Sequence, residues 1–182
     1  MKTETLKTIQ TLSNLGRILS KIAFVLSVVA FCLCIAGILS LAFFPESIKV
    51  GGVTIQGLVQ ASDTLTEGTL YATMAASAVM LAGEAVLAKL AEKYFRNELA
   101  DGTPFTFGGA KELLRLGICA IAIPIGTSVV AHIVFSVLEN ILENVGDWDI
   151  TDPVSVGLGV MMIVTSLICK YGAELAQDKD PA

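Results

Sequence analysis

Glu84 and His132 are acid–base side chains inside the hydrophobic stretches of this sequence. An ionisable group within a membrane span is costly and frequently functional. Glu84 precedes Leu90 by six residues, which is about 9 Å of helix rise. We expect its carboxylate to form an ion pair or to extend toward water, and a coupling-ion or substrate site is the alternative. The basic residues expected at the same level are Lys89, Arg115 and Lys170.

His132 is the only histidine, and it has Ser128 and Ser136 one helical turn to either side. We interpret it as a hydrogen-bonding residue between helices, with pH sensing or proton relay as the alternative. Pro124 lies in the middle of the same hydrophobic stretch. Because proline removes a backbone hydrogen bond and crowds the carbonyl of Ala120, we expect a kink there.

The other groups that could bind a metal or act as nucleophiles have simpler interpretations. Asp147, Asp149 and Asp152 weakly resemble a calcium loop, but the glycine and the final glutamate of an EF-hand are missing. We therefore expect a solvated acidic loop. Cys32 and Cys34 are two residues apart and point about 200° apart on a helix, so they do not form a redox pair. All four cysteines, which include Cys119 and Cys169, are interpreted as small apolar side chains of membrane helices.

The sequence lacks glycine-rich nucleotide loops, nucleophile elbows and paired metal-ligand motifs. We therefore predict no catalytic residue, no cofactor, no metal site and no enzymatic activity. Nucleic-acid binding is not expected, because the few basic residues flank hydrophobic spans.

Four hydrophobic stretches must position these side chains. Hydrophobic residues make up 54% of the 182 residues, and the mean hydropathy is +0.73. Spanning a bilayer takes about 20 apolar residues. We predict an all-α membrane protein, an antiparallel bundle of four transmembrane helices in a single integral membrane domain over residues 1–182. The predicted spans are residues 22–44, 69–90, 113–138 and 154–170.

The segments around the spans also have recognisable patterns. Residues 1–21 have apolar residues at helical spacing and four basic residues, which predicts a short amphipathic helix; a frayed terminus leading into the first span is the alternative. The alternating stretch KVGGVTIQG, from Lys49, favours a short hairpin. Small-residue pairs at Ala72 and Ala76, and at Ala78 and Ala82, predict close helix packing.

Segregated charge predicts the orientation. The N-terminal segment, the central loop and the C-terminal tail hold eleven Lys and Arg residues, and the two other loops hold one. Residues 139–152 contain five acidic residues and no basic residue. The positive-inside rule places both termini and the central loop in the cytoplasm, and Trp148 fits an interfacial anchor on the other side.

Two short patterns identify a related family. The first is DGTPF at residues 101–105 followed by KELLRLG at 111–117, and the second is YGAEL at 171–175. Together they resemble the bacterial four-helix membrane proteins filed as domain of unknown function twenty-nine seventy-five. The resemblance implies four transmembrane helices in a bacterial inner membrane and carries over no catalytic residue. The matching positions are Asp101, Gly102, Pro104, Phe105, Arg115, Tyr171, Gly172 and Glu174.

These observations favour a non-catalytic accessory, regulatory or immunity-type subunit of the bacterial cytoplasmic membrane. The alternative is a small oligomeric transporter or channel that uses the Pro124 kink and Glu84. A membrane enzyme ranks third, because no nucleophile, acid and base can be brought together. The expected partners are the lipid bilayer, a membrane or cytoplasmic protein, and further copies of this chain.

Overall fold

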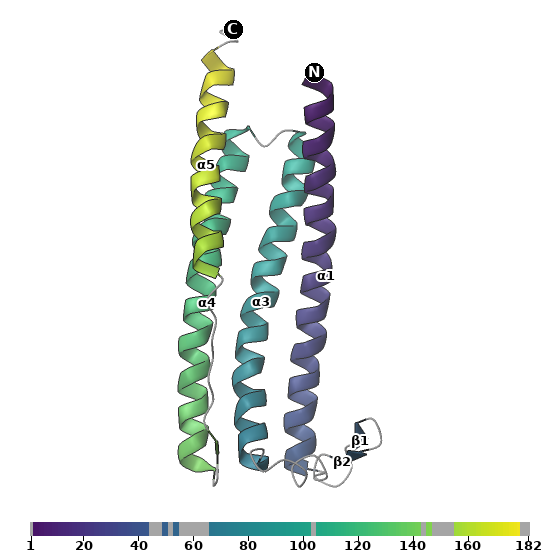
Figure 1. Cartoon of the computed structure of the whole chain (residues 1–182), viewed down its shortest axis with the longest axis vertical. Helices are drawn as coiled ribbons and strands as arrows, with labels where there is room; N and C mark the ends of the chain where they lie inside the picture. The colour runs from purple at the N-terminus through teal and green to yellow at the C-terminus, as the bar shows by residue number, and fades with distance from the viewer. Residues whose placement is uncertain are drawn as a thin grey trace. The chain divides into compact units, whose positions relative to one another are not determined.

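The computed structural model of the chain (Figure 1) describes residues 2–43, 49–50, 53–54, 66–102, 105–142, 145–146 and 155–178. Its elements are helix α1 (Lys2–Phe43), strands β1 (Lys49–Val50) and β2 (Val53–Thr54), and helices α3 (Glu67–Asp101), α4 (Phe107–Ile141) and α5 (Ser155–Asp178). The described part of the chain is therefore helical, apart from one pair of two-residue strands.

All four helices are long and apolar enough to span a membrane. The candidate segments are Lys7–Phe43, Glu67–Asp101, Phe107–Ile141 and Gly157–Leu175, and they include nearly all of the predicted spans. Helices α3 and α4 have 35 residues each, about 52 Å of helix, whereas the bilayer core is about 30 Å thick. Both helices are thus longer than a span requires, and the polar residues at their ends explain why the sequence placed the span limits further inside.

Helix α1 differs from the prediction of a separate amphipathic helix, because it continues without interruption from Lys2 to Phe43. Gly16 is the only glycine or proline before Gly37, so nothing in this stretch breaks the backbone hydrogen-bond ladder. Ser13 is buried while Leu12 and Leu15 are exposed. Ser13 therefore faces the protein, and Leu12 and Leu15 face outward.

The helices contribute to two compact units. The first comprises Met1–Leu26, Glu84–Pro124 and Asp152–Ala182, and the second comprises Ser27–Gly83 and Ile125–Thr151. The single domain over residues 1–182 stays a prediction.

In the first unit, the core lies around Tyr94 and includes Ala110, Leu113, Leu116 and Cys169, all buried. Helices α4 and α5 approach each other at two glycines. A Cβ added to Gly117 would lie 3.0 Å from the carbonyl oxygen of Gly159, and one added to Gly159 would lie 2.9 Å from that of Gly117. The ring of Phe95 lies over Gly16 of α1, because a Cβ added to Gly16 would lie 2.7 Å from the ring carbon Cζ.

In the second unit, Ala72 and Ala76 of α3 are fully buried against Ala131 and Phe135 of α4. This confirms the close packing predicted for that pair of alanines. In the other predicted pair, Ala78 is buried and Ala82 is exposed. Thr69 links α3 to the chain after α4, because its Oγ1 accepts a hydrogen bond of 2.8 Å from the backbone N–H of Gly146.

The predicted hairpin is confirmed by strands β1 and β2, which pair antiparallel with Lys49 opposite Thr54 and Val50 opposite Val53. Several predictions fall outside the described residues. They concern Pro104 of the family pattern, the acidic positions Asp147, Asp149 and Asp152, and the interfacial Trp148.

Candidate functional site

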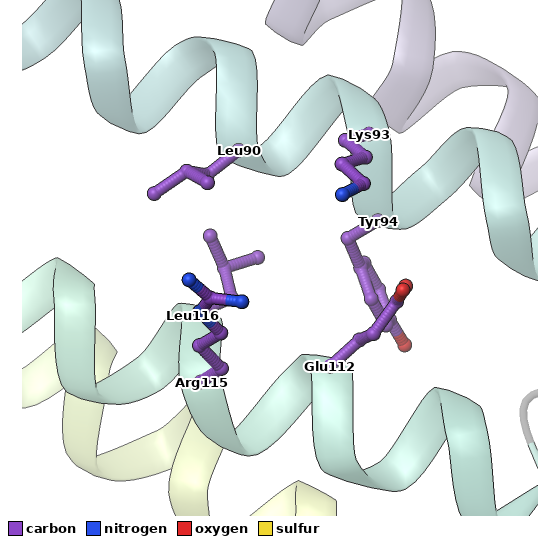
Figure 2. A pocket seen from close by; sticks show the side chains of 6 residues that line it. All are labelled: Leu90, Lys93, Tyr94, Glu112, Arg115 and Leu116. Carbon is purple, nitrogen blue, oxygen red and sulfur yellow. The ribbon is translucent and has the colours of Figure 1, made fainter.

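Two helix faces of the first unit meet near the end of α3 and the start of α4. On α3, Leu90, Lys93, Tyr94 and Asn97 follow one another at spacings of three, one and three residues, which is one helix face. On α4, Glu112, Arg115 and Leu116 follow the same rule. Figure 2 shows the labelled side chains of both helices directed toward a shared cavity.

Defined caps end α3 and begin α4. Gly102 has φ of +73°, a left-handed conformation that glycine adopts without steric cost. Its backbone N–H donates to the carbonyl of Glu98 at 3.0 Å, which ends α3 as a glycine C-cap does. Thr106 caps α4, because its Oγ1 accepts a hydrogen bond of 2.9 Å from the N–H of Gly109. The turn predicted at Asp101 and Gly102 is therefore confirmed.

Tyr94 lines the cavity and belongs to the buried core beside it. Its side chain is buried among Ala110, Leu113 and Leu116, and its ring lies edge-on to that of Phe95, with centroids 5.3 Å apart. Edge-to-face pairs of this kind stabilise packed aromatic rings. The ring of Tyr94 thus fixes the distance between α3 and α4 where the cavity lies.

The cavity has a volume of about 110 Å³ and is lined by Leu90, Lys93, Tyr94, Glu112, Arg115 and Leu116. The two cationic side chains give its lining one net positive charge. Glu112 is held by a neighbour outside the lining, because the Nδ2 amide of Asn97 donates to both carboxylate oxygens, at 2.9 and 3.0 Å. Among the described residues, neither Lys93 nor Arg115 forms an ion pair.

The two short sequence patterns, DGTPF and YGAEL, meet at Phe105 and Gly172. Phe105, from the first pattern, covers Gly172 of the second, and a Cβ added to Gly172 would lie 2.7 Å from Cδ1 of the Phe105 ring. The hydroxyl of Ser166 in α5 also donates to the carbonyl of Ala110 in α4 at 2.8 Å. The glycine of the second pattern therefore leaves room for the aromatic ring of the first.

Three other pattern positions, Asp101, Tyr171 and Glu174, are exposed. The Oδ2 of Asp101 accepts a hydrogen bond from the hydroxyl of Thr106 at 3.4 Å. Tyr171 is exposed, and Glu174 forms an exposed ion pair with Lys170 at 3.9 Å. Exposed pairs of this kind contribute little to stability, so these positions contribute mainly to the charge of the surface.

Glu84 is exposed on α3, and it forms no ion pair among the described residues. Two of its expected partners are engaged elsewhere. Lys89 pairs with Glu92 at 2.8 Å and lies over the ring of Phe24, 5.0 Å from the centroid, and Lys170 pairs within α5. Among the described residues, Glu84 therefore does not have the predicted ion-pair partners, and extension toward water and a coupling-ion or substrate site stay predictions.

His132 is exposed on α4, and Pro124 lies inside that helix. His132 belongs to the second unit and the cavity to the first. His132 is therefore not part of the candidate site. The four cysteines are free thiols, and Cys169 is buried. Among the described residues, no group of three or more His, Cys, Asp or Glu side chains could hold a metal ion.

Arg115 is the cavity residue that the sequence singled out, and Lys93, Tyr94, Asn97 and Glu112 are site residues that it did not. The signal for those on α3 was present, because Leu90, Lys93, Tyr94 and Asn97 have the spacing of one helix face. The apolar residues of α3 predicted a membrane span and gave no separate prediction for this helix face. What the sequence could not supply was the partner face on α4.

No family model matches this chain, and no characterised protein or solved structure matches it. The resemblance to the four-helix family therefore stays a prediction based on the two patterns.

Proposed function

We propose that this protein is a non-catalytic multi-pass protein of the bacterial cytoplasmic membrane and acts as an accessory or regulatory subunit. In this proposal the four helices cross the membrane in alternating direction, with both termini and the α3–α4 connection in the cytoplasm. The observation that carries it is the combination of four helices able to span a membrane with the charge segregation of the sequence.

The helix contacts support a role based on packing. Gly117 and Gly159 bring two helix backbones close together, as small residues do in membrane bundles. Helix α1 is the least covered of the four, because 6% of its most apolar window is buried, compared with 22% for α3. Its outward leucines are available to lipid or to a helix of a partner subunit.

Reporter fusions and purification test this proposal. An alkaline phosphatase fusion after Ala182 should be inactive, because that enzyme needs an oxidising compartment, and one after Gly146 should be active. Activity after Ala182 would refute the orientation. Purification in mild detergent with mass spectrometry should then recover a stoichiometric partner, and a homo-oligomer alone would refute the accessory role.

A second candidate function, an oligomeric transporter, is favoured by the exposed Glu84 without an ion-pair partner in the described chain. An unpaired carboxylate on a span is expected to face a shared interior or an aqueous path. Glu84→Gln should then abolish ion-dependent flux in liposomes while leaving the fold intact. Glu139→Gln, another exposed carboxylate, is the matched control, and equal flux in both variants would exclude this function.

A further inference from the structure

The cavity between α3 and α4 has its two leucines at one end and a cationic side chain at each end. In Figure 2, Leu90 and Leu116 lie together at one end, with the guanidinium group of Arg115 beside them, and Lys93, Tyr94 and Glu112 lie at the other. Leu90 is also the lining residue of α3 nearest to the hydrophobic stretch that precedes it. A ligand that fits this cavity has both an apolar part and an anionic part.

The ammonium group of Lys93 and the guanidinium group of Arg115 have N–H donors that could bind an anion. Lys89 and Lys170 are engaged with carboxylates, whereas Lys93 and Arg115 form no ion pair within the described chain. Their side chains extend from facing helices into one cavity (Figure 2). A guanidinium group matches the geometry of phosphate oxygens, and an ammonium group adds a point charge.

Glu112 is the one anionic group in the lining, and it would oppose a bound anion. Its two carboxylate oxygens already accept hydrogen bonds from the amide of Asn97. In Figure 2 its carboxylate lies beside the ring of Tyr94 and not between the two cations. The carboxylate of Glu112 is thus already engaged by a residue outside the lining.

The cavity is large enough for a phosphate group. Its volume is about 110 Å³, and one water molecule occupies about 10–15 Å³ of such space. Basic pockets between helices near a membrane surface suit the headgroups of anionic lipids. We propose that this cavity binds the phosphate group of an anionic phospholipid, with Lys93 and Arg115 as the donors and Leu90 and Leu116 beside the apolar part of the lipid. This inference rests on the membrane placement proposed above.

The test compares two charge-matched double variants. Lys93→Gln with Arg115→Gln removes both cations of the cavity. Arg96→Gln with Lys111→Gln removes two exposed cations from the same helices that do not line it. Both variants change the net charge equally, so a general attraction to anionic lipid should weaken equally in both.

The purified protein is titrated in neutral detergent with short-chain phosphatidylglycerol, and bound lipid is counted by native mass spectrometry. The cavity variant should bind phosphatidylglycerol about 30-fold more weakly than the wild type, because each basic residue contributes about fivefold. The control variant should stay within about twofold of the wild type. Equal weakening in both double variants, or no weakening in either, would overturn the proposal.

Two further measurements identify the source of the phosphate and separate this site from membrane placement. Thermal stabilisation by inorganic phosphate without stabilisation by phosphatidylglycerol would overturn the lipid assignment and identify a soluble phosphate ligand. Flotation of the wild type with neutral phosphatidylcholine vesicles tests insertion alone. If the wild type does not float, the membrane placement fails; if it floats but its lipid binding does not depend on Lys93 and Arg115, only the site fails.

Discussion

The contact between Gly117 and Gly159 supports a prediction in which one chemical change has opposite effects at two positions of α5. A Cβ added to Gly159 would lie 2.9 Å from the carbonyl oxygen of Gly117 and still closer to Cγ1 of Ile121. A Cβ added to Gly157, two residues earlier, would meet nothing within 4 Å. Gly159→Ala should therefore destabilise the first unit, whereas Gly157→Ala should not.

The magnitude follows from two opposing effects. Replacing glycine by alanine in a helix gains about 0.5–1 kcal/mol, and Gly157→Ala should show this gain alone. Overpacking against a backbone that cannot rotate away costs about 1–3 kcal/mol. Gly159→Ala should therefore be net destabilising, by about 1 kcal/mol. The two variants should differ in unfolding free energy by about 2 kcal/mol.

The buried thiol of Cys169 provides the assay. It belongs to the same core as α4 and α5, so its labelling requires that core to open. With Cys32, Cys34 and Cys119 replaced by alanine, Gly159→Ala should label about 30 times faster than Gly157→Ala, because about 1.4 kcal/mol is a factor of ten and the two variants differ by about 2 kcal/mol. Equal labelling rates would refute the argument from close backbone approach.

The remaining predictions concern the α3–α4 connection and the cavity. Gly102→Ala should lower stability by about 1–2 kcal/mol because of the positive φ, whereas Gly108→Ala, which meets nothing within 4 Å, should not; equal melting temperatures of the two variants would contradict this. Asn97→Leu should cost about 1 kcal/mol in thermal unfolding, because Glu112 loses both hydrogen bonds, and an unchanged melting temperature would show that water replaces them. Tyr94→Ala should cost about 3 kcal/mol or more, because it removes a buried aromatic ring, and loss of cooperative melting would be the expected sign.

The helices could be predicted from the sequence because long apolar runs have few alternatives to a membrane-spanning helix. The turn at Gly102 was also predictable, since glycine after an acidic residue is a strong local signal. The continuity of α1 was not, because the pattern of charges before residue 22 suggested a boundary that no proline or glycine pair enforces. A change in composition is a weaker boundary signal than a break in the hydrogen-bond ladder.

The candidate site was only partly predictable. Arg115 was singled out from the family pattern, but Tyr94 and Asn97 gained their importance from residues of α4. One sequence gives the face of each helix but not which two faces meet. The contact between Phe105 and Gly172 was unpredictable for the same reason, because it joins two patterns that are separate along the chain.

The position of Gly172 in the chain has a consequence for biosynthesis. Phe105 emerges from the ribosome 67 residues before Gly172, so its ring has no glycine to cover until α5 has been made and has docked. The caps at Gly102 and Thr106 use residues close to them in sequence and can form earlier. The two caps can thus form early, whereas the contact between Phe105 and Gly172 forms only when the last helix has reached its place.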